Sequence, residues 1–217
     1  MFELLVLAGF GALVIRNLHL RDEEFSMLPR RISDKLGKLW DIAHQGMREN
    51  RFLRAEKALL TILKIDEKNA AAYNRLGILY AKQKEYKDAI DCFEIASSID
   101  PSASSLHNLG LIYYETENYQ KAATAFEQAL KLEDDLAARH IAYAKVEEKL
   151  GNFRLMLEEL KKAVDLEPNH ESYSLLQKAY ESLGMQAEAD LIVQRLDKLI
   201  ATPARQRRVA RPKRVVI

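Results

Sequence analysis

The sequence predicts an all-α protein, an α-solenoid of five helix-turn-helix repeats with an apolar helix at the amino-terminal end. Two observations support this fold class. The 217 residues include only 8 Gly and 5 Pro, and long stretches rich in Ala, Leu, Glu and Lys favour helices. In addition, one pattern of aromatic and small residues returns after 33 residues, a spacing typical of stacked helix pairs.

The repeated pattern is clearest in the middle of the chain. Its first copy consists of Tyr73, Leu76, Gly77, Tyr80, Ala89, Phe93, Ala96 and Pro101. Its second copy consists of Leu106, Leu109, Gly110, Tyr113, Ala122, Phe126 and Ala129, with Asp134 in place of the proline. This series resembles the tetratricopeptide repeat, in which an aromatic residue, Leu-Gly, Tyr, Ala, Phe and Pro follow one another over about 34 residues. The resemblance implies stacked helix pairs that bind other proteins.

Weaker copies extend the array in both directions. Forward of the second copy lie His140, Tyr143, Ala144, Gly151, Met156, Leu160, Ala163 and Pro168, then Tyr173, Leu176, Tyr180, Gly184, Ala189 and Val193. Backward of the first copy lie Leu39, Ile42, Ala43, Ala55, Leu59 and Ile62. The predicted repeat domain therefore covers residues 36–202, in units of about 36–69, 70–102, 103–136, 137–169 and 170–202.

Within each unit, two apolar stripes with helical spacing flank a polar turn, which specifies a pair of helices. Gly77 and Gly110 fall inside helices, where glycine costs about 1 kcal/mol relative to alanine. We therefore expect a neighbouring helix to approach closely at both positions. Gly151 and Gly184 fall where the first helix of a unit must stop, and they predict carboxy-terminal caps.

The resemblance to tetratricopeptide proteins implies that part of each first helix lines a groove for a partner protein. The groove residues expected from this register are Trp40, His44, Met47, Asn74, Ile78, Lys82, His107, Leu111, Tyr114, Glu115, Lys145 and Lys149. One end of this set is aromatic and apolar and the other is charged, which suits an extended or helical peptide held by its side chains. The alternative is that many of these residues are merely solvated or pack against the amino-terminal segment.

Some members of the family hold the carboxylate at the end of a chaperone tail with a set of Lys, Asn and Arg side chains. Asn108 matches one of these positions. The preceding unit, however, offers Asn74 and Ile78, and the following unit offers Ala138 and Ala142. The resemblance therefore does not extend to this type of carboxylate recognition.

No pattern in the sequence predicts catalysis. The five histidines are dispersed among different units, without a zinc-binding pair. The chain has one cysteine, Cys92, on the same predicted helix as Phe93. No glycine-rich nucleotide loop is present, and the abundant carboxylates lie beside lysines as on solvated helix faces. We therefore expect neither an enzyme nor a bound metal, cofactor or small-molecule substrate.

The amino-terminal segment contains an unbroken apolar run, Leu4 to Ile15. As a helix its 12 residues would span about 18 Å, which is short against a hydrocarbon core of about 30 Å. The run is nevertheless apolar on every side, whereas a helix packed on the repeats needs only one apolar face. We favour an uncleaved membrane anchor in residues 1–15, followed by a charged linker in residues 16–35. The alternatives are a helix packed on the repeats and, because basic residues are lacking before Arg16, less favourably a secretion signal.

The flanking charges give an orientation for such an anchor. Arg16, Arg21, Arg30 and Arg31 follow the apolar run, and no Lys or Arg precedes it. This asymmetry predicts a single-pass protein with its amino terminus outside and its repeats in the cytoplasm. The arrangement is similar to that of bacterial inner-membrane tetratricopeptide proteins with an amino-terminal anchor.

The carboxy-terminal segment, residues 203–217, is strongly basic. It contains Arg205, Arg207, Arg208, Arg211, Lys213 and Arg214 and no acidic residue. Removing these six charges from the total of +1 leaves about −5 for residues 1–202. This composition predicts a disordered tail that binds anionic lipid or nucleic acid, or that only increases solubility.

Together these features predict a non-catalytic scaffold or adaptor, tethered to a membrane, that binds a peptide or helix of another protein in its groove. The alternative is a soluble, cytoplasmic repeat protein whose arginine-rich tail docks on RNA or the ribosome. A third and weaker possibility is a subunit of an enzyme complex.

Overall fold

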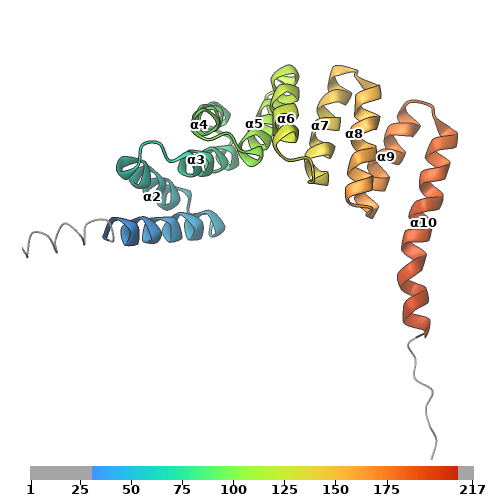
Figure 1. Ribbon diagram of the computed structural model, residues 1–217, viewed down its shortest axis with the longest axis horizontal. Helices are drawn as coiled ribbons and strands as arrows, with labels where there is room; N and C mark the ends of the chain where they lie inside the picture. The colour runs from blue at the N-terminus through green and yellow to red at the C-terminus, as the bar shows by residue number, and fades with distance from the viewer. Residues whose placement is uncertain (1–30, 210–217) are drawn as a thin grey trace, which may run out of the picture. The chain divides into compact units, whose positions relative to one another are not determined.

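The computed structural model describes the backbone of residues 31–209 and the side chains of residues 31–198 (Figure 1). The chain divides into two compact units, Met1–Leu79 and Tyr80–Ile217. The apolar run Leu4 to Ile15, most of the linker and residues 210–217 lie outside the described part. No helix within residues 31–209 is long and apolar enough to cross a membrane.

Residues 31–209 are helical apart from short connections, as the sequence predicts, and contain no strand. The helices are residues 31–48, α2 (Phe52–Ile65), α3 (Ala70–Gln83), α4 (Tyr86–Ile99), α5 (Ala103–Glu115), α6 (Tyr119–Leu132), α7 (Ala137–Leu150), α8 (Phe153–Leu166), α9 (His170–Ser182) and α10 (Gln186–Val209). They follow one another as helix–turn–helix pairs, in which a tight turn joins the two members of a pair.

In the first unit, the helix of residues 31–48 packs against α2 through small side chains. A Cβ atom added to Gly46 would lie 3.0 Å from the Cβ of Ala55, so the two helices approach too closely there for a larger residue. Ala43, Leu59 and Ile62 of the same two helices are fully buried. The close approach provides dispersion contacts that a bulkier interface would lack.

In the second unit, each helix from α4 to α10 packs against the next one along the chain (Figure 1). The buried side chains are the apolar stripe of each helix, with Phe93 on α4 and Phe126 on α6 almost completely enclosed. Such neighbour-to-neighbour packing buries the apolar face that one helix pair alone would leave exposed.

Gly110 makes the close contact that the sequence predicts. An added Cβ atom would lie 2.9 Å from two ring carbons of Phe126. Because Gly110 has no side chain, the ring of Phe126 on α6 can pack directly against the backbone of α5. Gly77 is also buried.

The turn between the two helices of a pair uses the same backbone conformation each time. One residue has a positive φ in each of these turns, and these residues are Asn50, Lys84, Glu117, Gly151 and Gly184. Gly151 is the carboxy-terminal cap of α7, and Gly184 follows the end of α9. The predicted glycine caps are therefore confirmed, and three other turns adopt the left-handed conformation without glycine.

The ends of the repeat domain differ from the predicted boundaries. Residues 31–35, placed in the linker, are part of the helix of residues 31–48. Residues 203–209, placed in the disordered tail, are the last turns of α10. Pro203 removes only one backbone donor, while the residues after it, mainly Ala, Arg and Gln, are good helix formers. The helix therefore continues past the proline until Val209.

Candidate functional site: the groove along α5, α7 and α9

The first helices of three successive pairs, α5, α7 and α9, form a hollow of about 360 Å³. Its floor is apolar and contains small side chains from the start of α7. The lining residues are His107, Leu111, Tyr114, Glu115, Phe126, Ala137, Ala138, Ile141, Ala142, Lys145, Glu167, Asn169, Glu171 and Ser172. We call this the α5–α7 hollow. A space of this size can hold one or two large side chains of a bound segment.

A second hollow of about 300 Å³ lies between α7 and α9. It is lined by Ile141, Ala144, Lys145, Glu148, Met156, Leu160, Leu175, Lys178, Ala179 and Ser182. Ile141 and Lys145 line both hollows. The two therefore adjoin along the exposed side of α7, and together they form one groove, which we call the α5–α9 groove.

Charge is unevenly distributed along this groove. Glu115, Glu167 and Glu171 line the α5–α7 hollow, against one lysine, Lys145. The hollow between α7 and α9 instead has Lys145 and Lys178 against one glutamate, Glu148. A bound segment would therefore meet an acidic end and a basic end.

His107 lies at the inner wall of the α5–α7 hollow. Its ring packs edge-on against Phe126, with 5.4 Å between the ring centroids. Burial lowers the pKa of His107, and the positive charge of Arg139 lowers it further. At neutral pH the imidazole is therefore uncharged, and it adds to the apolar character of the wall.

The structure brings five of the predicted groove residues together in the α5–α7 hollow: His107, Leu111, Tyr114, Glu115 and Lys145. Leu111 is 39% exposed. Tyr114 is half-buried, and its ring packs against Tyr119 at 5.6 Å between centroids. Two further predicted residues, Lys82 and Lys149, are exposed but line neither hollow.

The other predicted groove residues belong to the first unit. Trp40 is half-buried, with its ring 5.5 Å from that of exposed His44. Asn74 and Ile78 are half-buried on α3. Met47 differs from the prediction, because it is only 7% exposed and belongs to the core. Near the end of its helix, Met47 directly follows Gly46, where α2 lies very close, so its side chain is enclosed.

Sequence reasoning missed several residues of the groove, most clearly Ile141. Ile141 lies 34 residues after His107, and Lys145 lies 34 residues after Leu111. The repeat spacing alone could therefore have identified Ile141 once His107 was assigned to the groove. Glu167 and Glu171 are different, because they reach the hollow from the end of α8 and the first turn of α9. Nothing in the local sequence indicates that reach.

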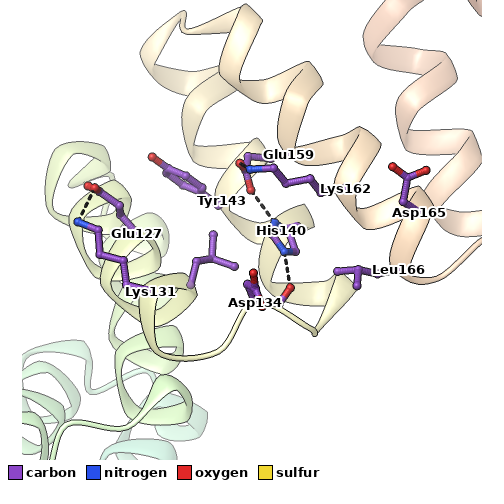
Figure 2. A pocket seen from close by; sticks show the side chains of 10 residues that line it. Glu127, Lys131, Asp134, His140, Tyr143, Glu159, Lys162, Asp165 and Leu166 are labelled. Carbon is purple, nitrogen blue, oxygen red and sulfur yellow. Dashed lines mark hydrogen bonds and ion pairs between the residues drawn. The ribbon is translucent and has the colours of Figure 1, made fainter.

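A separate cavity of about 460 Å³ lies between α6, α7 and α8, and Figure 2 shows the side chains that line it. His140 and Glu159 lie at its floor, 4% and 3% exposed. The Nδ1 atom of His140 is 2.6 Å from Oε2 of Glu159, and Nε2 is 2.8 Å from the carbonyl oxygen of Asp134. Lys162 donates to the second oxygen of Glu159 over 2.8 Å.

This arrangement explains a buried histidine without assigning it a reaction. A backbone carbonyl only accepts hydrogen bonds, so Nε2 of His140 carries a proton and donates it to Asp134. Nδ1 shares a further proton with the Glu159 carboxyl group. Both ring nitrogens are thus engaged in holding α7, α8 and the preceding loop together, and neither is available to a substrate.

The remaining reactive groups do not form a site. Cys92 is a half-buried free thiol on α4, and burial together with Asp88 and Asp91 raises its pKa to about 11. No group of His, Cys, Asp and Glu side chains in residues 31–198 is arranged to hold a metal ion. Of the basic tail residues, Arg205, Arg207 and Arg208 lie on the last turns of α10, and Arg211, Lys213 and Arg214 lie outside the described residues.

Comparison with known proteins agrees with the geometry of the helix pairs. Family models described as tetratricopeptide repeat match residues 68–135 and 107–169. Residues 68–169 are therefore tetratricopeptide repeats, a fold whose members generally serve as scaffolds for protein interactions.

Solved structures of the same fold include two MamA proteins and YrrB. One MamA structure is 23% identical, with a TM-score of 0.67, and the match covers 75% of this chain and 90% of that one. MamA from Desulfovibrio magneticus RS-1 is 16% identical with a TM-score of 0.70, covering 78% and 97% of the two chains. YrrB, described as a tetratricopeptide protein with an unusual peptide-binding site, is 19% identical with a TM-score of 0.61, covering 70% and 80%. No curated protein matches the chain.

Proposed function

We propose that this protein is a scaffold that binds a short segment of a partner protein in the α5–α9 groove. The observation that supports this most directly is the α5–α7 hollow, where Leu111, Tyr114 and Ile141 present apolar surface beside charged groups. Exposed aromatic and apolar groups in a preformed hollow are common centres of binding energy. The peptide-binding site described for YrrB, which shares the fold, is consistent with this role.

The groove suits an elongated partner better than a small molecule. The two hollows adjoin at Ile141 and Lys145, so a segment can place one side chain in each. Opposite charges at the two ends would fix the direction in which the segment lies. Because helices form the groove wall, the protein loses little conformational entropy when a segment binds.

Site-specific cross-linking tests this function in the full chain. A photo-reactive amino acid at position 111 should capture the partner, because Leu111 is exposed within the hollow. The same amino acid at position 158 is the control, since Glu158 is exposed on α8 and lines neither hollow. Equal capture at both positions, or none at position 111, would contradict the proposal.

The substitution Tyr114→Ala should weaken capture of that partner by at least about 1 kcal/mol, or roughly fivefold. Its effect on unfolding should stay well below the 3 to 5 kcal/mol typical of a buried aromatic residue, because Tyr114 is only half-buried. Tyr119→Ala is the matched control. This variant also removes the contact between the two tyrosine rings, but Tyr119 does not line the groove. Unfolding curves and capture yields are measured on both variants.

We also propose that residues 1–15 tether the scaffold to a membrane, with the repeats on the cytoplasmic side. This proposal is supported by the apolar run and the arginines that follow it. Full-length protein should remain with membranes during carbonate extraction, and a chain that begins at Arg31 should not. Recovery of monomeric full-length protein without detergent would overturn the tether and leave the groove proposal standing.

A further inference from the structure

Two features of this protein have no role in a general scaffold. One is the excess of acidic groups around the α5–α7 hollow. The other is the basic segment of residues 210–217, which the sequence singles out and which lies outside the described residues. These two features have complementary chemistry.

The acidic groups of the hollow are available to a ligand. Glu115 and Glu171 are exposed, and neither forms an ion pair within the described residues. Glu167 accepts one hydrogen bond from Asn169 and keeps its second carboxylate oxygen. Against these three carboxylates stands Lys145, while His107 is held in its neutral form by burial. The hollow therefore favours a cationic segment.

The segment of residues 210–217 carries the matching groups. Arg211, Lys213 and Arg214 are followed directly by Val215, Val216 and Ile217, without any acidic residue. β-Branched residues favour an extended backbone, and Pro212 fixes one further φ angle, so binding restricts few additional conformations. The segment thus has three positive charges to pair with the carboxylates of the α5–α7 hollow. It also has three apolar side chains that match the apolar floor of the hollow.

The length of α10 decides which copy of the groove the segment can occupy. α9 has 13 residues and α10 has 24, and the two helices pack side by side in opposite directions (Figure 1). The additional turns carry the end of α10 about 16 Å past the start of α9. Residues 210–217, fully extended, span about 26 Å. A segment that turned back would bring only its last three residues, about 10 Å, past the start of α9, so Arg211, Lys213 and Arg214 could not lie against Glu115 on α5.

We propose that the α5–α7 hollow of one copy binds residues 210–217 of a second copy. The basic side chains would lie against Glu115, Glu167 and Glu171, and the valine and isoleucine side chains would occupy the apolar floor. This inference rests on the proposed function, since it names the occupant of the same groove. It makes the chain its own partner, so that assembly and capture of another protein compete for one site.

The experiment measures binding of a labelled peptide to the full chain. The probe is residues 205–217 with an amidated end, so that no terminal carboxylate contributes, and binding is followed by fluorescence anisotropy. The receptor is the full chain carrying R211Q, K213Q and R214Q, which frees its hollow from other copies. Saturable binding that weakens with added salt is expected, because the contacts are largely electrostatic.

Charge reversal locates the site. E115K with E171K in the receptor should weaken peptide binding at least about tenfold. E181K is the matched control, because Glu181 is an exposed acid on the same helix as Glu171 but does not line the hollow, and binding should be unchanged. A peptide with Glu at positions 211, 213 and 214 should bind the E115K/E171K receptor better than the unmodified receptor. Thermal unfolding of each receptor variant checks that the fold is retained.

Several results would overturn the inference. These are an absence of saturable binding, equal loss in E181K, or unchanged binding of a peptide with Ala at positions 215, 216 and 217. Binding of the peptide to RNA or to anionic vesicles, with no effect of the groove variants, would assign the segment to those partners instead. If cross-linking at position 111 still captures a different protein while the peptide does not bind, this inference fails and the scaffold function stands. If neither occurs, both fail.

Discussion

The third and fourth helix pairs share a backbone arrangement but stabilise it with different chemistry. In the pair α5 and α6, Leu106 and Ala125 are buried apolar residues. The residues 34 positions later, in α7 and α8, are His140 and Glu159, which form a buried pair 2.6 Å apart. The same two positions of the repeat thus hold an apolar pair in one case and a charged or proton-sharing pair in the other.

The connection that leads into each pair explains this difference. α5 begins with a capping box in which Ser102 and Ser105 satisfy the first backbone donors, and α9 begins in the same way with Asn169 and Ser172. α7 has no side-chain cap. Arg139, at the position equivalent to Ser105, instead donates to the carbonyl oxygen of Glu133. His140 donates to the next carbonyl, that of Asp134. Buried polar side chains thus satisfy a loop that lacks the usual cap.

The two pairs also differ in the sizes of the side chains that meet at the centre of each pair. Gly110 on α5 accommodates Phe126 on α6. The equivalent residues are Ala144 on α7 and Leu160 on α8, both buried. A larger residue on one helix is therefore matched by a smaller one on its partner, as close-packed interiors require. The combined volume of the two facing side chains is therefore similar in both pairs, although the residues differ.

The largest expected effect tests the polar pair. Glu159→Ala should destabilise the fold by about 3 to 5 kcal/mol, because it leaves His140 and Lys162 without their buried carboxylate partner. The double variant His140→Leu/Glu159→Ala, which installs the residues of the third pair, should recover much of that loss. Urea denaturation of the two variants measures both values. A double variant as unstable as the single one would show that the pair is needed as such.

The next effect tests the exchanged packing. Gly110→Ala should cost about 1 to 3 kcal/mol, because the new Cβ atom would lie 2.9 Å from the ring of Phe126. Combining it with Phe126→Leu, the residue of the fourth pair, should cost less than the sum of the two single changes. Thermal melts of the three variants form a double-mutant cycle. A raised melting temperature for Gly110→Ala would place this glycine in contact with solvent.

A smaller effect distinguishes the turns of the two pairs. Gly151 has φ of 77°, and Glu117 at the equivalent turn has φ of 59°. The left-handed region costs a residue with a Cβ atom about 1 kcal/mol. Gly151→Ala should therefore destabilise by about that amount, and Glu117→Gly should stabilise by somewhat less, since the unfolded chain gains freedom. Changes of the same sign in both variants, measured by urea denaturation, would contradict this interpretation.

The smallest effect is a pH dependence at the groove wall. Because the pKa of His107 is lowered in the folded state, the unfolded chain binds a proton more readily below about pH 6.5. His107 thus contributes stability that is present above that pH and is lost as the pH falls towards the folded pKa. His107→Ile, the residue that the fourth pair has at this position, should flatten this part of the stability profile. If the stability of His107→Ile depends on pH between 5 and 7 as the unsubstituted protein does, other groups cause the pH dependence.

Local patterns in the sequence determined the helix pairs, because an apolar stripe with helical spacing followed by a polar turn has one stable solution when copies stack. They also determined the turns at Gly151 and Gly184, where the backbone has a positive φ, and the close contact at Gly110, because a glycine inside a helix indicates that a neighbouring helix lies close. Only the tertiary structure decided that Met47 is buried, that Glu167 lines the same hollow as Glu115, and that His140 meets Glu159. The last two residues are 19 positions apart on different helices, and their pairing depends on how those helices lie together, which no spacing along one helix encodes.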